Sequence, residues 1–219
     1  MESRHHRRIA LTLVAGLLAT SITTARAADT AAAPDLATLD WNTYAAMPVA
    51  ASGADAERIR RGKYLVTTSG CNDCHTPFKM GANGPEPDLG RMLSGHPEQV
   101  VITAPAKPQE SPWAFAGSQT NTAWSGPWGV SFTANLTPDP ETGLGKWTVR
   151  NFKDTIRSGR HLGRGRPVLP PMPVAMYRHM TDEDLEAVFA YLQSIPAVRN
   201  HVPEPLPPAG GDAVAATHD

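Results

Sequence analysis

The sequence predicts a mostly α-helical fold, and two observations lead to this prediction. Three segments, residues 54–68, 147–158 and 181–194, carry apolar side chains at the spacing that forms one face of a helix. Residues 77–147, between the first two segments, are rich in proline, glycine and tryptophan and show little periodicity. We therefore expect a helical domain that contains a long insert without regular elements.

The first helix is expected to run from residue 54 to 68. Ile59, Gly62 and Val66 fall on one face of it, and Ser69-Gly70 ends it. A glycine in the middle of a helix costs about 1 kcal/mol relative to alanine. Either a close packing contact requires Gly62, or it is a tolerated surface glycine, and the sequence leaves both explanations open.

The second helix is expected over residues 147–158, with Thr148 as its N-cap and Gly159 just past its end. Its expected buried stripe consists of three residues: Val149, Phe152 and Ile156.

The third helix, residues 181–194, has the strongest boundary signals. Thr181 is a typical N-cap, three acidic residues follow it in the first turn, and Pro196 stops the helix. The expected buried stripe is Leu185, Val188, Phe189 and Leu192.

Residues 71–75 read Cys-Asn-Asp-Cys-His, a C-x-x-C-H sequence that is the attachment signature of a c-type haem. The thiols of Cys71 and Cys74 can bind the two vinyl groups of haem, and His75 can ligate the iron from below. These are the two cysteines of the sequence. A thioredoxin-like dithiol would need a βαβ pattern, half of a zinc site would need further ligands, and a short-loop disulfide would leave His75 unexplained.

The second axial ligand of a haem iron decides between electron transfer, which a closed site favours, and ligand or peroxide chemistry at an open site. Three methionines precede the last helix. Met172 lies in a proline-rich loop, residues 166–173, whose stiffness suits a fixed ligand. Met180 directly precedes the helix cap, and Met176 lies between the two. We favour Met172, with Met180 as the next candidate.

Three histidines complete the set of possible ligands. His161 and His179 compete with the methionines, although a solvent-exposed position is the better interpretation of His161. His96, in a Ser-Gly-His-Pro stretch, is likewise expected to be an exposed loop histidine.

The first 27 residues have the features of a cleaved export signal. Arg4, Arg7 and Arg8 precede a short apolar run, residues 9–19, and Ala25-Arg26-Ala27 fits the cleavage rule. An uncleaved membrane anchor is the alternative. Export agrees with the haem motif, because free thiols outside the cytoplasm tend to pair. Cleavage would leave 16 basic and 20 acidic residues, a balance that gives no indication of nucleic-acid binding.

The sequence suggests four parts: the signal peptide, a linker or loosely docked arm at residues 28–53, a haem domain at 54–197 and a disordered tail at 198–219. Trp41 and Tyr44 could attach the arm to the domain. Seven basic residues between 146 and 166 could steer an acidic redox partner, pair with haem propionates, or form a solvated face. The tryptophans of the insert could bury a porphyrin or pack loops together: Trp113, Trp124, Trp128 and Trp147.

The order of these features resembles a class I cytochrome c over roughly residues 54–197: helix, C-x-x-C-H, methionine-bearing loop, then a helix with Ala190-Tyr191-Leu192. Four stretches are similar to one haem module of the cytochrome c subunits of bacterial membrane-linked dehydrogenases, and to exported dihaem cytochromes c. They are residues 132–139, 142–147, 169–173 and 180–185.

The resemblance implies a cytochrome c fold with one covalently attached haem c, held by Cys71, Cys74, His75 and Met172, with His75 and Met172 on the iron. Close approach of the C-terminal helix would then explain Gly62. It also implies a redox partner such as a dehydrogenase or an oxidase, and association with a membrane complex. The chain departs from the family in having a single C-x-x-C-H and a longer insert at residues 111–129.

The function expected from the sequence is a periplasmic mono-haem electron carrier that is not itself an enzyme. It would pass single electrons between a dehydrogenase and a quinone or terminal oxidase chain. A haem enzyme or gas sensor with an open distal site is the alternative.

Overall fold

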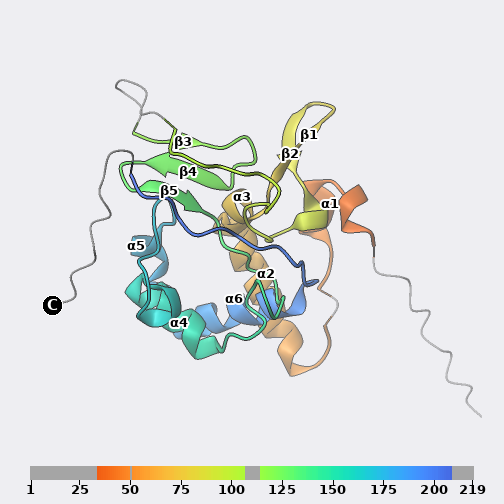
Figure 1. Ribbon diagram of the computed structural model, residues 1–219. Helices are drawn as coiled ribbons and strands as arrows, with labels where there is room; N and C mark the ends of the chain where they lie inside the picture. Colours follow the sequence, from red (N-terminus) through yellow and green to blue (C-terminus); the bar gives the residue numbers. More distant parts are fainter. Residues whose placement is uncertain (1–33, 50, 107–113, 209–219) are drawn as a thin grey trace, which may run out of the picture. The chain divides into compact units, whose positions relative to one another are not determined.

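The computed structural model describes residues 34–49, 51–106 and 114–208 (Figure 1). The expected signal peptide, residues 1–27, lies outside the described residues. Within them, no helix combines the length and apolar character that crossing a membrane requires.

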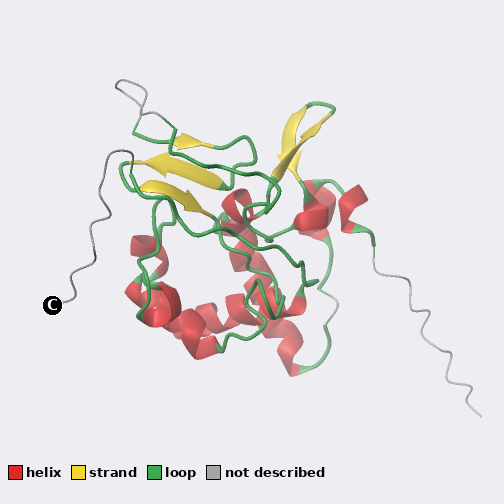
Figure 2. Cartoon of the chain, viewed as in Figure 1, coloured by secondary structure: helices red, strands yellow, loops and turns green. Residues whose placement is uncertain are grey.

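Helices make up most of the regular structure, as Figure 2 shows. The helices and 3-10 turns are η1 (Leu36–Thr38), α1 (Trp41–Ala46), α2 (Ala54–Thr68), α3 (Cys71–His75), η2 (Leu89–Arg91), α4 (Val149–Ser158), η3 (His161–Gly163), α5 (Val174–Tyr177) and α6 (Asp182–Ser194). The strands are β1 (Phe78–Gly81), β2 (Gly84–Pro87), β3 (Ala116–Gly117), β4 (Ala123–Gly126) and β5 (Gly129–Phe132).

The helices α2 and α6 pack directly against each other, and Gly62 lies at their contact. A Cβ atom on Gly62 would stand 1.9 Å from the carbonyl oxygen of Ala187 and 2.7 Å from the Cβ of Tyr191. Because no side chain fits there, the packing explanation of Gly62 is confirmed. The predicted bounds of α2 are also confirmed.

Helix α4 begins and ends at the predicted signals. Thr148 and Asn151 form a reciprocal capping box, and Gly159 ends the helix with a positive φ of 70°. Phe152 and Ile156 are buried as expected. The prediction for Val149 was wrong: its side chain is exposed, because it lies in the first turn, before the helix reaches the core.

Helix α6 follows its N-cap Thr181, whose hydroxyl accepts a hydrogen bond from the backbone N–H of Asp184. Leu185, Val188 and Leu192 are buried, and the half-buried Phe189 packs against Phe152 of α4. The apolar stripe of α6 therefore faces both α2 and α4.

The insert contains regular structure, which corrects the expectation of an irregular stretch. Strands β1 and β2 form one antiparallel hairpin, and β3, β4 and β5 form a three-stranded antiparallel sheet. No strand in the described ranges exceeds four residues, so the alternation of buried and exposed side chains is too short to register in the sequence. Glycines with positive φ begin β2 and β5, which makes both hairpin turns possible.

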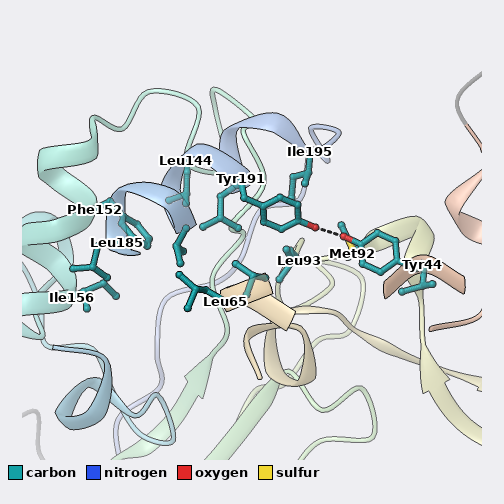
Figure 3. Close-up of a cluster of buried hydrophobic side chains, with 14 residues drawn as sticks. Tyr44, Leu65, Met92, Leu93, Leu144, Phe152, Ile156, Leu185, Tyr191 and Ile195 are labelled. Atoms are coloured by element: carbon teal, nitrogen blue, oxygen red, sulfur yellow. Dashed lines mark hydrogen bonds between the residues drawn. The ribbon is translucent and has the colours of Figure 1, made fainter. Parts of the chain in front are cut away.

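The expected arm, residues 28–53, contains α1, and Tyr44 of this helix is buried in the main apolar cluster. Figure 3 shows the hydroxyl groups of Tyr44 and Tyr191 pointing toward each other, and they share a hydrogen bond. Lys63 donates a hydrogen bond to the carbonyl oxygen of Tyr44 at 3.0 Å. Helix α1 is thus docked on α2 and α6 through one buried aromatic side chain.

The prediction of a disordered tail was wrong for residues 198–208. Asn200 is fully buried, and its amide nitrogen donates hydrogen bonds to the carbonyl oxygens of Ser94 and His96 at 2.7 and 2.8 Å. Leu206 pairs with Val130 at the edge of β5 through two backbone hydrogen bonds of 2.9 Å. These anchors order the segment despite its composition. Residues 209–219 lie outside the described residues.

Candidate haem site

A cavity of about 570 Å³ lies among α2, α3, α4, α6, the proline-rich loop (residues 166–173) and the C-terminal segment (residues 198–208). This volume falls within the usual range of small-molecule sites, roughly 300–1,000 Å³. The four residues assigned from the sequence all line it: Cys71, Cys74, His75 and Met172. Side chains about 100 residues apart in the sequence therefore line one cavity.

The imidazole of His75 is held in the tautomer that a metal ligand requires. His75 is buried, and its Nδ1 donates a hydrogen bond to the carbonyl oxygen of Ala134 at 2.8 Å. Because Nδ1 carries the proton, Nε2 keeps a free lone pair. Burial also lowers the pKa of His75, which favours the neutral ring. The motif itself gave no indication of Ala134.

The thiols of Cys71 and Cys74 are free and lie on one turn of α3. Gly70, in a left-handed conformation, sets the start of this turn. Burial raises the pKa of Cys71 to about 11 and raises that of Cys74 as well, so both sulfurs stay protonated near neutral pH. A thioether forms when such an S–H adds across a vinyl double bond, with hydrogen and sulfur going to its two carbons.

Tyr177 of α5 marks the cysteine end of the cavity. Its hydroxyl donates a hydrogen bond to the carbonyl oxygen of Ser69. Burial, followed by the nearby thiols of Cys71 and Cys74, raises the pKa of Tyr177 to about 12. Sequence reasoning missed this residue, because a tyrosine in a short helix carries no signal of its own.

Of the three candidate methionines, Met172 and Met180 line the cavity, while Met176 is 71% exposed and does not. The loop that carries Met172 is fixed on both sides. The hydroxyl of Ser131 donates a hydrogen bond to the carbonyl oxygen of Pro170, and the N–H of Val174 donates one to that of Met172. The cavity therefore holds two thioethers, and the choice of Met172 over Met180 stays a prediction.

The three histidines occupy different environments. His161 is exposed but borders the cavity, where it packs edge-on against Trp147 at 5.2 Å between ring centres. His179 is exposed and lies away from the cavity lining. The expectation of an exposed His96 was wrong: it is fully buried, and its ring nitrogens hydrogen-bond with Thr122 and the carbonyl oxygen of Val100.

The tryptophans of the insert divide between two roles. Trp147 lines the cavity, whereas Trp124 and Trp128 pack with Phe115 on the three-stranded sheet. Trp113 lies outside the described residues.

Charged side chains gather at a second end of the cavity. Arg166 forms an ion pair with Glu204 at 3.0 Å, and both residues line the cavity. Desolvation, followed by the charge of Arg166, lowers the pKa of His161. The segment 201–205, which had been expected to be disordered, supplies one wall here.

The residues present fit a covalently bound haem. The cavity is bounded mostly by apolar side chains and receives two protonated thiols, an imidazole with a free nitrogen and two thioethers. In the described ranges, no three His, Cys, Asp or Glu residues come together in the way a bare metal ion would need. This donor set suits an iron already held by a porphyrin.

Comparison with known proteins finds relatives that belong to dehydrogenases. The chain is 40% identical over 78 residues to one of the subunits of the nicotinate dehydrogenase of Pseudomonas putida, a match that covers 35% of this chain and 6% of the relative. It is 37% identical over 138 residues to the cytochrome c subunit of the alcohol dehydrogenase (quinone) of Gluconacetobacter polyoxogenes. This match covers 63% of this chain and 22% of the relative. It is 28% identical over 151 residues to the fructose dehydrogenase cytochrome subunit of Gluconobacter japonicus. This match covers 68% of this chain and 24% of the relative. No family model matches the chain.

The chain is related to cytochrome c subunits of dehydrogenases, and its cavity is lined by the four residues that the sequence assigns to a c-type haem site. The matched parts span no more than about a quarter of these relatives. More particularly, the chain resembles one haem module of such a subunit.

Proposed function

We propose that this protein is a mono-haem c-type cytochrome that carries single electrons and is not itself an enzyme. The observation that carries the proposal is the convergence of the two cysteines, the tautomer-fixed His75 and Met172 on one cavity. Bound haem supplies the one-electron chemistry of its iron.

The side chains of this site hold and shield the cofactor. Cys71 and Cys74 would hold the haem covalently, and His75 would bind the iron through Nε2. The carbonyl oxygen of Ala134 keeps the ring from rotating and raises its basicity as a ligand. Met172, on a loop fixed by its neighbours, would supply the second protein ligand to the iron. A thioether ligand in that role would close the site and raise the reduction potential.

The first test is the optical spectrum of the purified holoprotein, oxidised and reduced, in three methionine variants. We expect Met172→Ala to lose the weak ferric iron–sulfur band, while Met180→Ala keeps it. Met176→Ala is the matched control, because Met176 lies in the same segment but is 71% exposed and outside the cavity.

Two results would correct the proposal. Loss of the band in Met180→Ala alone would move the distal ligand to Met180 and leave the electron carrier in place. A high-spin wild-type protein that binds carbon monoxide readily would replace the carrier with a haem enzyme or sensor.

The proposed cellular setting is the periplasm, after cleavage behind Ala27. Electrons would pass from a dehydrogenase toward a quinone or a terminal oxidase, in association with a membrane complex. The relatives named above, which are subunits of dehydrogenases, support a dehydrogenase as the partner. Fractionation of cells and sequencing of the mature N-terminus test the location, and a start at Ala28 is the expected result.

A further inference from the structure

The outer side of the Met172 loop presents apolar side chains to solvent. Met172, Pro173 and Val174 line the cavity, while Pro170, Pro173, Ala175 and Met176 are exposed on the surface. Pro173 belongs to both sets, so a single layer of chain separates the cavity from solvent at this point. An electron that leaves through this wall crosses less protein than one that leaves through α2 and α6.

Three arginines lie on the segments that flank this apolar surface: Arg160, Arg164 and Arg178. A bridge between Arg160 and Pro167 places Arg160 beside the loop. The guanidinium of Arg178 comes within 3.9 Å of the Cβ position of Gly159, which in turn lies 3.1 Å from Val174. Arg164 is exposed in the turn that follows η3, between Arg160 and Pro167 in the sequence.

The remaining cations nearby are largely neutralised by carboxylates of the same chain. Lys153 pairs with Asp182 and Glu186, and Arg157 pairs with Asp182. Two further pairs are Arg150 with Asp154 and Arg166 with Glu204. In contrast, no ion pair involves Arg160, Arg164 or Arg178 within the residues that the structure describes.

This pattern separates the seven basic residues that the sequence placed between 146 and 166. Most of those on α4 hold α4 to α6, so they are structural. Arg160 and Arg164 of these seven, together with Arg178, carry three positive charges, in a chain whose formal net charge is −1. Positive charge is therefore concentrated beside a wall of the cavity that is a single layer of chain.

We propose that the surface formed by Pro170, Pro173, Ala175 and Met176, with its rim of Arg160, Arg164 and Arg178, is the docking site of an acidic redox protein. The inference rests on the proposed electron-carrier function. The apolar centre provides close contact and the rim cations steer an acidic partner into position, since opposite charges raise the association rate roughly 10- to 1,000-fold at low salt.

The experiment measures the oxidation of the ferrous holoprotein by stopped flow, with ferricyanide, tris(phenanthroline)cobalt(III) and a small acidic blue-copper protein as three separate oxidants. The variant is Arg164→Glu/Arg178→Glu. Its matched control is Arg58→Glu/Arg60→Glu, which makes the same change of charge on α2 at side chains that are 55% exposed. Reduction potentials are measured for each protein, so that a change of driving force is separated from a change of docking.

We expect the loop variant to slow oxidation by ferricyanide and by the copper protein about tenfold at low ionic strength, and to accelerate oxidation by the cobalt complex. The α2 control should stay within about twofold of wild type, and all differences should fade as salt increases.

Equal effects of the two double variants would overturn the proposal, because the overall charge and not this surface would then set the rates. Binding of wild type, and not of the loop variant, to phosphatidylglycerol vesicles would overturn it if the copper protein showed no preference, since the surface would then face a membrane. Failure of the electron-carrier function itself would give a different result. The ferrous protein would then bind carbon monoxide, and its oxidation by all three oxidants would be slow in wild type and in both double variants.

Discussion

Replacing Gly62 by alanine should destabilise the protein even though alanine is the better helix former. A Cβ atom would stand 1.9 Å from the carbonyl oxygen of Ala187, whereas carbon and oxygen atoms normally approach no closer than about 3.3 Å. The two helices would have to separate by about 1.4 Å, and the atoms in the way belong to backbone that cannot rotate aside. Overpacking of this kind costs about 3 kcal/mol, at the upper end of its usual range.

The gain in helix propensity offsets about 1 kcal/mol of this cost, which leaves a net loss of about 2 kcal/mol. For a chain of this size the midpoint of thermal unfolding would fall by about 4–8 °C. The same separation would loosen the cavity, because Val66 of α2 and Leu192 of α6 line it.

Denaturant unfolding of the holoprotein, followed by far-ultraviolet circular dichroism, measures the change in the free energy of unfolding. Arg58→Ala is the control, since it also introduces alanine into α2 but at an exposed side chain, where effects stay within about 0.5 kcal/mol. A Gly62→Ala protein as stable as wild type, or more stable by about 1 kcal/mol, would show that Gly62 is not a packing residue.

Two further variants test the region that joins the insert to the C-terminal segment. Asn200→Ala should lower the free energy of unfolding by about 3 kcal/mol or more, because it leaves the carbonyl oxygens of Ser94 and His96 buried without a donor. A loss below about 0.5 kcal/mol would instead fit an unattached tail. His96→Gln should flatten the pH dependence of stability. Burial lowers the pKa of His96, so its contribution is complete above the unfolded value of about 6.5 and is lost as pH falls toward the folded value, by at most about 1.4 kcal/mol per pH unit. A free energy of unfolding that falls equally steeply between about pH 7.5 and 5 in wild type and in His96→Gln would contradict this assignment.

The sequence predicts those elements whose limits are set by local chemistry. Ser69-Gly70, Thr148, Gly159 and Thr181 act within one turn of the helix they delimit, and each is observed in its predicted role. The haem motif is local in the same sense, since α3 alone brings Cys71, Cys74 and His75 to one side of the chain.

Two features that the sequence did not predict, the order of the segment after Asn200 and the burial of His96, depend on contacts between distant parts of the chain. Pro, Ala and Gly predominate after Asn200, and this composition correctly indicates that residues 201–208 cannot build a core of their own. Their order comes instead from partners far earlier in the chain: the N–H of His201 donates a hydrogen bond to the carboxylate of Glu98, and Leu206 pairs with Val130. The burial of His96 has the same origin, so neither could be read from its neighbours in sequence.

The same distant contacts connect the order of the C-terminal segment to the haem site. Val198 accepts a hydrogen bond from Asn135, which follows the carbonyl group that orients His75. Leu206 pairs with Val130, next to the Ser131 that holds the Met172 loop, and Glu204 pairs with Arg166 at the charged end of the cavity. Each attachment ends on a segment that positions one of the proposed ligands or borders the cavity. The C-terminal segment therefore supports the segments that carry or position both proposed ligands, and its loss would loosen His75 and Met172 together.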